Sequence, residues 1–360
     1  MTLMLTSVLS SAEAMLALER GADIIDCKDP SRGALGALPM DEIEAIVTAV
    51  DGRRPVSAVV ELPHDSAHAH SAIGAVAETG VDYVKFALPM TPDAREVVAG
   101  LAPLAAKVRL VPVLFADLDP DFDLLGDLSA AGFHGAMLDT AHKGRGRLLD
   151  CMRLDALAQF VRACRAKKLV SGLAGSLEAP DVPRLLVLNP DVLGFRGALC
   201  DGGERRSTID ADAVTLIRDL IRQALAPGER EEEIDHVFVR DLVLPVEIGA
   251  YAFEHGHAQR VRFNIDVEVL RVSGPDDMRM VFSYDVIMDA IKIILAAGHI
   301  ELVETIAERL AESVLLHERA RAVSIEIAKL DVAPPASVGV SIRRERAAVL
   351  AAPLPANVAL

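Results

Sequence analysis

The sequence predicts a (β/α)8 (TIM) barrel over residues 1–225, followed by a smaller α+β domain over residues 234–346. Three observations predict this division. In the first part, apolar strand-like runs alternate eight times with helical segments, which is typical of a parallel barrel. A short charged stretch at 226–233 then has the composition of a linker. Beyond it, polar and apolar residues alternate as in antiparallel strands with one solvated face.

The eight strands of the first part are predicted by continuous apolar runs, as expected for strands covered on both faces. They lie at 3–7, 22–26, 56–61, 83–88, 110–116, 135–139, 169–174 and 192–196. Helical patterns lie at 11–20, 40–50, 67–79, 92–107, 124–131, 154–166, 179–186 and 211–225. Gly21, Gly80 and Gly132 follow three of these helices, and glycine commonly caps a helix end. An open doubly wound sheet is the alternative, although no G-x-G-x-x-G motif follows the first strand.

The second part shows the element order ββααββ. Strands are predicted at 235–244, 259–272, 323–327 and 338–342, with helices at 284–297 and 300–317. In the second of these helices, Leu302, Ile306, Leu310 and Val314 recur every four residues and form one apolar stripe. Residues 347–360 are rich in Ala and Pro, so we expect a loosely ordered tail.

Composition excludes several classes of function. The formal net charge of −16 argues against nucleic acid or an anionic membrane as the partner. No apolar segment reaches the roughly 18 residues that a membrane span requires, and the N-terminus lacks a signal-peptide pattern. The four cysteines have neither zinc-site nor disulfide-framework spacing, so we expect a protein of the reducing cytoplasm.

Charged residues gather where predicted barrel strands end, which is the rim that carries function in such barrels. Lys28 follows the second strand, Lys85 lies in the fourth, and Asp139 ends the sixth, with Lys143 four residues later. Burial and mutual repulsion lower the pKa of a lysine, and a neutral amine can attack a carbonyl to form a Schiff base. Structural ion pairing is the simpler alternative for the first two lysines. The candidate partners are Asp26 or Asp29 for Lys28, and Asp82 or Asp139 for Lys85.

The last two barrel strands are followed by glycine-rich loops, where barrels usually hold phosphate. Backbone N–H groups in such loops can donate to phosphate oxygens, and an arginine can add charge. A surface salt bridge is the alternative role for the arginine. The predicted phosphate-binding residues are Gly175, Ser176, Arg196, Gly197, Gly202 and Gly203.

The motifs that hold these residues resemble those of (5-formylfuran-3-yl)methyl phosphate synthase, a family of methanofuran biosynthesis, over nearly all of residues 1–225. They are Asp-Cys-Lys-Asp-Pro at 26–30, Gly-Ala-Leu-Gly at 33–36, Met-Leu-Asp-Thr-Ala at 137–141, Leu-Ala-Gly-Ser at 173–176 and Gly-Phe-Arg-Gly-Ala-Leu-Cys at 194–200. The resemblance implies condensation of two glyceraldehyde 3-phosphate molecules, with loss of phosphate and water. It also implies that Lys28 forms the Schiff base and Lys85 is the acid–base group. Asp139 and Lys143 match further polar positions of the family's active site, and no metal or other cofactor is implied.

Residues 234–346 are similar to dihydroneopterin aldolase, through the motifs at 248–254, 282–284, 302–311, 328–329 and 338–340. This resemblance implies a T-fold, rings of identical subunits and a dihydropterin held between subunits. The family cleaves 7,8-dihydroneopterin to glycolaldehyde and a 6-hydroxymethyl pterin. By position, Glu304 binds the pterin, Lys329 is the general base, Tyr284 donates a proton and Glu254 lies near the side-chain hydroxyls.

We therefore expect a two-domain cytoplasmic lyase that forms homo-oligomers through its second domain and acts on small molecules. Two alternatives remain at this stage. The second domain could be only an oligomerisation scaffold, or the barrel could bind sugar phosphates without forming a covalent adduct. A cluster of three histidines and a separate H-x-H pair could bind metal, but we expect solvated loops at both places. These histidines are His64, His68, His70, His255 and His257.

Overall fold

The computed structural model describes residues 2–62, 66–89, 93–222, 234–271, 278 and 281–346. The chain divides into two compact units, with the boundary after Arg222. The expected linker at 226–233 and the expected tail at 347–360 lie outside the described residues. Among the described residues, no helix combines the length and the apolar character needed to cross a membrane.

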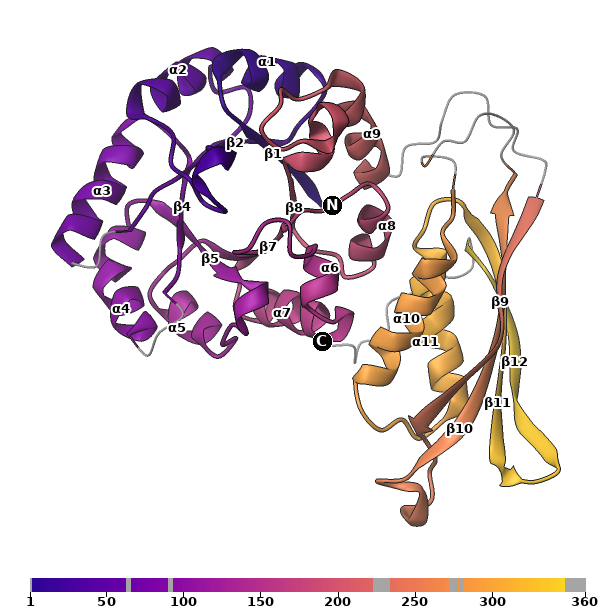
Figure 1. Cartoon of the computed structure of the whole chain (residues 1–360). Coiled ribbons are helices and arrows are strands. Elements are labelled where there is room, and N and C mark those ends of the chain that lie inside the picture. Colours follow the sequence, from indigo (N-terminus) through magenta and orange to yellow (C-terminus); the bar gives the residue numbers. More distant parts are fainter. Residues whose placement is uncertain are drawn as a thin grey trace. The chain divides into compact units, whose positions relative to one another are not determined.

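The first unit is a closed barrel of eight parallel strands, each hydrogen-bonded to the next in chain order (Figure 1). The last strand pairs with the first, and Leu3 lies opposite Val192. This closure confirms the predicted barrel and makes the doubly wound alternative wrong. The strands are β1 (Leu3–Val8), β2 (Ile24–Cys27), β3 (Val56–Val59), β4 (Tyr83–Ala87), β5 (Arg109–Phe115), β6 (Gly135–Asp139), β7 (Val170–Leu173) and β8 (Val192–Phe195).

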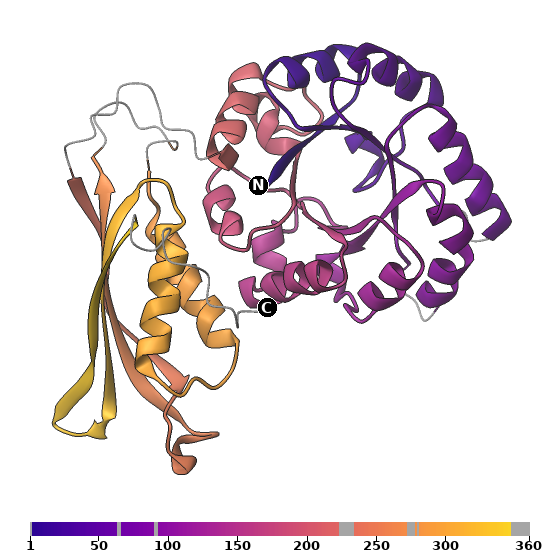
Figure 2. The same cartoon turned by 180° about the vertical axis from the view of Figure 1, so that it is seen from behind.

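Helices surround the barrel as an outer ring (Figure 2). Their apolar faces explain this placement: α7 buries Leu157, Phe160, Val161 and Cys164, which recur at helical spacing. The one-turn helix α6 was not expected from the sequence. The helices are α1 (Ser11–Glu19), α2 (Met40–Val50), α3 (Ser66–Glu78), α4 (Ala94–Ala105), α5 (Leu124–Ala130), α6 (Leu148–Cys151), α7 (Leu154–Ala166), α8 (Asp181–Leu186) and α9 (Ala211–Arg222). Short 3-10 helices follow several strands: η1 (Pro30–Arg32), η2 (Ala116–Leu118), η3 (Gly197–Leu199) and η4 (Asp201–Gly203).

The second unit is a four-stranded antiparallel sheet in the order β12-β11-β10-β9, with two helices. Every second residue of β10 from Val261 to Val267 is buried, so one face of the sheet forms the core. The element order confirms the predicted ββααββ unit, although β11 is much longer than the expected 323–327. The elements are β9 (Ile234–Glu247), η5 (Ala252–Glu254), β10 (Ala258–Leu270), α10 (Tyr284–Ala296), α11 (Val303–Leu315), β11 (Ala320–Ala333) and β12 (Ala336–Glu345).

Candidate active sites

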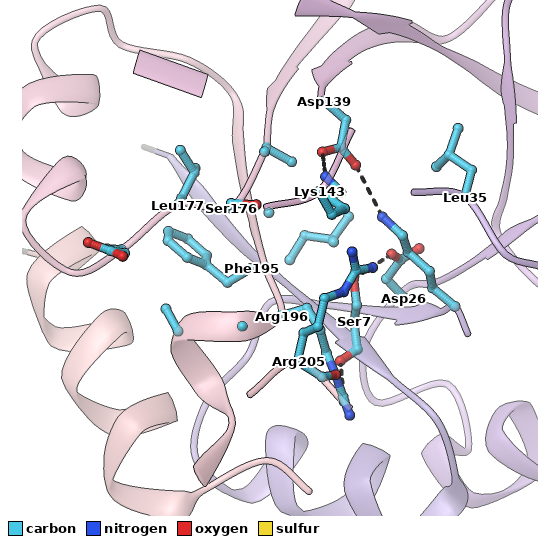
Figure 3. Close-up of a pocket in the computed structure, with 18 of the residues that line it drawn as sticks. Ser7, Asp26, Leu35, Asp139, Lys143, Ser176, Leu177, Phe195, Arg196 and Arg205 are labelled. Atoms are coloured by element: carbon cyan, nitrogen blue, oxygen red, sulfur yellow. Dashed lines mark hydrogen bonds and ion pairs between the residues drawn. The ribbon is translucent and has the colours of Figure 1, made fainter. Parts of the chain in front are cut away.

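A cavity of about 250 Å³ lies inside the barrel at the C-terminal ends of the strands (Figure 3). It unites the four predicted catalytic residues of this unit, Lys28, Lys85, Asp139 and Lys143. Most of the predicted phosphate-binding residues also line it, namely Gly175, Ser176, Arg196, Gly197 and Gly203. Gly202 lies beside them in η4 but is not one of the lining residues.

Asp139 holds two of the lysines. Its Oδ2 lies 3.1 Å from the Nζ of Lys28, and its Oδ1 accepts a hydrogen bond from the Nζ of Lys143. The backbone N–H of Thr140 also donates to Oδ1, at 2.8 Å. Burial raises the pKa of Asp139, but the two ammonium groups outweigh it and hold the pKa well below its usual range. Asp139 is therefore an anion that fixes the positions of both amines.

Lys85 lies deeper in the barrel and is bound by a different carboxylate. Its Nζ is 2.6 Å from Oδ1 of Asp26, and both residues are almost completely buried. Ser57 and Ser7 donate to the two oxygens of Asp26, at 2.6 and 2.9 Å. Burial lowers the pKa of Lys85, the Lys28 charge lowers it further, and Asp26 opposes both effects. The net effect is a pKa below the usual range of lysine, so this amine gives up its proton more readily than an exposed lysine does.

The ion-pair partners considered from the sequence were wrong for both lysines. Lys28 pairs with Asp139 and Lys85 pairs with Asp26, because side chains that point into a barrel meet across its lumen rather than along one strand. Asp29 caps η1 through the N–H of Ser31. Asp82 accepts a hydrogen bond from the N–H of Val56 at the opposite end of the strands.

Asp26 was considered from the sequence only as a partner of Lys28 and not as a residue of the site. It lines the cavity and is the only carboxylate bonded to Lys85 among the contacts of the described residues. A signal for it existed, because residues two apart on a strand point to the same face. Asp26 and Lys28 are two apart at the end of β2 and both point into the lumen.

Asp117, in η2, fixes the loop that carries Lys143. Its carboxylate accepts hydrogen bonds from the backbone N–H of Ala141 at 2.7 Å and of His142 at 2.9 Å. The His142 ring lies 2.9 Å from the same carboxylate. The loop is thereby anchored at the two residues directly before Lys143. The pKa of Lys143 itself is lowered chiefly by burial.

Arg196 does not have the phosphate-binding role expected of it, because protein oxygens accept hydrogen bonds from all three nitrogens of its guanidinium. Two N–H groups donate to the carboxylate of Glu13, at 2.6 and 3.2 Å. The remaining bonds go to the backbone oxygens of Ser7, Arg205 and Ser207, at 3.1, 3.0 and 2.7 Å. An arginine has five N–H donors, so the contacts do not support phosphate binding by this side chain. The alternative of a surface salt bridge is also wrong, since the pair is buried.

Arg205 is the cation that the sequence reasoning overlooked. It lines the cavity (Figure 3). One of its N–H groups donates to the backbone oxygen of Gly33 at 3.1 Å. Burial lowers its pKa from the usual range of arginine. The pair Arg205-Arg206 directly follows Gly202-Gly203-Glu204, so its position in a glycine-rich loop was visible in the sequence.

The loop after β7 requires its glycine. Gly175 has a φ of +126°, and a Cβ there would lie 3.0 Å from Cγ2 of Thr140. Ser176, the next residue, has a φ of 50°. The close approach places the loop after β7 against the loop after β6, so both border one cavity.

The second unit contains a separate pocket of about 450 Å³. Lys329 and Glu254 line it and form an ion pair, with Nζ and Oε1 2.6 Å apart. Glu254 also accepts hydrogen bonds from Gln259 Nε2 and from the N–H of Tyr251, both at 3.1 Å. The hydrogen bond from Lys329, supported by those from Tyr251 and Gln259, lowers the pKa of Glu254 to about 2.

The structure unites three of the four residues predicted for this pocket. Glu304 lines it with Lys329 and Glu254, whereas Tyr284 is not one of its described lining residues. Tyr284 is the first residue of α10 and is 62% exposed. Tyr251 and Phe253 also line the pocket, and their rings stack with centroids 5.5 Å apart.

No group of three or more His, Cys, Asp or Glu residues that could hold a metal occurs in the described part of the chain. Of the histidines considered from the sequence, His64 lies outside the described residues. His68 and His70 belong to α3 rather than to a loop. His255 and His257 lie in the short segment between η5 and β10.

Comparisons with known proteins match both units. A family model described as 4-HFC-P synthase matches residues 4–218, and one described as dihydroneopterin aldolase matches residues 237–343. A Methylorubrum extorquens protein, provisionally named (5-formylfuran-3-yl)methyl phosphate synthase, is 45% identical over 61% of this chain and 91% of its own length. The Methanopyrus kandleri protein of that name is 34% identical over 56% of this chain and 91% of its own length. A solved structure of E. coli dihydroneopterin aldolase in complex with neopterin is 30% identical in sequence, with a TM-score of 0.28. The match covers 31% of this chain and 98% of the E. coli chain.

Proposed function

This chain belongs to the 4-HFC-P synthase family, and we propose that its barrel condenses two glyceraldehyde 3-phosphate molecules into (5-formylfuran-3-yl)methyl phosphate. The observation that carries the proposal is the pair of buried amines in one cavity, each bound by its own carboxylate. Lys28 lies 3.1 Å from Asp139, and Lys85 lies 2.6 Å from Asp26. Such a pair can divide covalent and acid–base work between two lysines.

In the proposed reaction, the amine of Lys28 attacks the aldehyde carbon of one triose phosphate and water leaves, which gives an iminium. The iminium draws electrons from the adjacent carbon, so the proton on that carbon becomes acidic. In this proposal Lys85 accepts this proton as a neutral amine, and the lowering of its pKa by burial favours that role. The resulting carbanion expels phosphate from the next carbon and leaves an enol. The terminal carbon of this enol attacks the middle carbon of the second triose, once that triose has isomerised to its ketone form. Loss of two water molecules closes the furan ring, and hydrolysis of the iminium releases the formyl group and the free Lys28 amine.

Phosphate groups of the substrates require cationic and N–H donors near the rim. We assign this role to Arg205 and to the loops at Gly175, Ser176, Gly197 and Gly203, all of which line the cavity. Arg196 supports the same rim indirectly, since its backbone acceptors include Arg205. Arg205→Ala should therefore raise the KM for glyceraldehyde 3-phosphate more than it lowers kcat.

The test of the proposal is reduction with borohydride in the presence of glyceraldehyde 3-phosphate, followed by mass spectrometry of peptides. The expected result is a reduced adduct on Lys28 that is absent in Lys28→Arg. An adduct on Lys85 instead would exchange the roles of the two lysines. Folded protein without an adduct on any lysine would refute covalent catalysis and leave a sugar-phosphate binding module.

For the second unit we propose dihydroneopterin aldolase activity, which releases glycolaldehyde from 7,8-dihydroneopterin. The pocket offers the necessary groups: Glu304 can accept two N–H bonds from the amide edge of a pterin. Lys329 can act as the base, and its partner Glu254 can face the substrate hydroxyls. Glu304→Gln should abolish pterin turnover with unchanged assembly. Unchanged turnover would exclude Glu304 from the reaction, and an assembled, unmodified protein without pterin turnover would favour the alternative in which this unit is only a scaffold.

Tyr284 fits this proposal if a second copy of the chain supplies it, as the family resemblance implies for a ring of subunits. Its exposure of 62% leaves it available to another subunit. Tyr284→Phe and Lys329→Ala should each be inactive alone, and mixed oligomers of the two should recover pterin turnover. Mixed oligomers that stay inactive would place both residues in one subunit or exclude Tyr284 from the reaction.

A further inference from the structure

A second cavity, of about 290 Å³, lies in the barrel at the N-terminal ends of the strands. We call it the lower cavity. Valine side chains form much of its wall, including Val111, Val170 and Val192. The lumen of a (β/α)8 barrel is ordinarily filled by layers of side chains. A cavity of this size means that side chains leave part of this lumen unfilled.

A thin layer of side chains separates the two cavities. Leu5, Lys85 and Met137 border both of them. Gly172 and Gly194 make room for Met137, since a Cβ at either position would lie within 3 Å of its side chain, at 2.9 and 2.8 Å. Lys85 is thus the one charged side chain that borders the active site above and the lower cavity beneath, among the described lining residues.

The lower cavity also reaches the carboxylate that holds Lys85. Ser57 lines the cavity, and its Oγ donates to Asp26 at 2.6 Å, while Asp26 lies 2.6 Å from Lys85. A cavity holds water when it is roomy and offers polar partners. Both conditions hold here, because the lining includes Lys85 and Ser57 as well as polar groups at the entrance.

The entrance of the lower cavity faces solvent at the start of the strands. Tyr83, His134 and Asp191 line it, and Asp191 is exposed. Val111 and Val170 retain partial exposure although they belong to the barrel wall. Water can therefore enter from the face opposite the substrate.

We propose that the lower cavity is a solvent port through which Lys85 exchanges protons with bulk water while substrate fills the active site. This inference rests on the proposed function, which assigns acid–base work to Lys85. When the Lys85 amine takes the carbon-bound proton, it becomes an ammonium group. That proton then passes to water in the lower cavity and leaves past His134, which restores the amine without opening the active site.

The first test is whether the lower cavity admits solvent. Val170→Cys places a thiol in its wall, and we expect methyl methanethiosulfonate to label this cysteine at the same rate with and without glyceraldehyde 3-phosphate. Peptide mass spectrometry distinguishes this thiol from the four native cysteines. A thiol at position 170 that stays unlabelled in folded protein would overturn the proposal.

The second test measures proton exchange at Lys85 directly. In deuterium oxide, the enzyme should exchange the hydrogen on the carbon next to the aldehyde of glyceraldehyde 3-phosphate. Because general acid–base catalysis contributes about 10²–10⁴-fold, filling the port with Val111→Phe should slow this exchange by about tenfold or more. The borohydride adduct on Lys28 should form as in the unmodified protein. Val111→Ala, which enlarges the cavity at the same position, should keep the exchange rate.

Chemical labelling of Val170→Cys repeats this test without relying on Val111→Phe to fold. The label fills the lower cavity only after the protein has folded. Benzyl methanethiosulfonate, added after folding, should slow the exchange and leave the Lys28 adduct intact. Exchange that stays equally fast in both filled forms would overturn the port. If the unmodified protein forms no adduct, the proposed function fails, and the labelling of position 170 still decides separately whether the cavity is open.

Discussion

Arg196 and Glu13 form an ion pair in which both residues are nearly inaccessible, with exposed fractions of 9% and 6%. Two charges in such a place stabilise the fold only as a pair, because removal of one leaves the other buried without compensation. The backbone acceptors of Arg196 bring the loop after β8 and the end of β1 to the same guanidinium. The residue thus closes the barrel rather than binding substrate.

Glu13→Ala should lower the free energy of unfolding of the barrel by about 3–5 kcal/mol, as is typical when a buried pair loses one partner. Urea denaturation measures this loss. Glu13→Leu combined with Arg196→Met should recover part of it, since neither charge remains. If Arg196→Met kept full stability and lost only affinity for glyceraldehyde 3-phosphate, the result would contradict the structural role and support phosphate binding by Arg196.

His317 provides a pH-dependent contribution to the stability of the second unit. Burial, with the nearby charges of Arg319 and Arg346, lowers its pKa to about 4. The ring packs edge-on against Phe282, with centroids 4.9 Å apart, and its Nδ1 accepts the N–H of Arg319. The folded protein therefore keeps this imidazole neutral at a pH where the unfolded chain protonates it.

The second unit should lose stability as the pH falls from about 6.5 towards about 4. In this window the unfolded state binds one more proton at His317 than the folded state, so the slope reaches about 1.4 kcal/mol per pH unit. Thermal unfolding of the unmodified protein and of His317→Gln across this range isolates the effect, because other titrating groups are common to both. Parallel curves for the two proteins would show that folding does not change the pKa of His317.

Among the structural elements, the loop after β6 depends on an anchor in another loop. Asp117→Ala removes the acceptor of two backbone N–H groups, at Ala141 and His142. Since displacement of a catalytic group by about 1 Å can slow an enzyme by about 100-fold, turnover by the barrel should fall by about 10- to 100-fold. The Lys28 adduct should still form. His142→Ala removes only the side-chain contact and should have a much smaller effect; equal losses would assign the role to the imidazole instead.

The loop between β9 and β10 contains a glycine that packs directly against the carboxylate of Glu254. Gly249 has a φ of +140°, and a Cβ there would lie 2.0 Å from the carboxyl carbon of Glu254. Gly249→Ala should displace Glu254 from Lys329 and abolish pterin turnover, while the barrel reaction continues. Gly256→Ala is the matched control, because Gly256 also has a positive φ, +72°, but no atom within 4 Å of the added Cβ. Equal losses in both variants would indicate backbone strain rather than the collision.

The positions of Lys28, Lys85 and Asp139 could be predicted because each follows from one strand and its end. Their ion-pair partners could not be predicted. The pairing of Lys85 with Asp26 depends on which side chains lie at the same height inside the closed barrel. Arg196 shows the same limit. Its place after β8 was clear, but Glu13 lies 183 residues earlier in the chain, and only barrel closure brings the two together.

In the molecule as a whole, each unit has its own buried core, so each should unfold independently. Calorimetry of the full chain should show two transitions. Glu13→Ala should move only the barrel transition, and His317→Gln only the other. A single transition that shifts with both substitutions would instead indicate that the two cores unfold cooperatively.

Closure of the barrel between its first and last strands also has a consequence for synthesis. The bond from Arg196 to the Ser7 oxygen spans 189 residues, which a ribosome needs about 10–40 s to add at roughly 5–20 residues per second. Until then, β1 has an unpaired edge and the lysines of the lumen have no enclosed site. The second unit is translated afterwards, so the barrel can close while that unit is still being made. A nascent chain that stalls before β8 exposes an incomplete sheet, whereas one that stalls after α9 already carries every strand of the barrel.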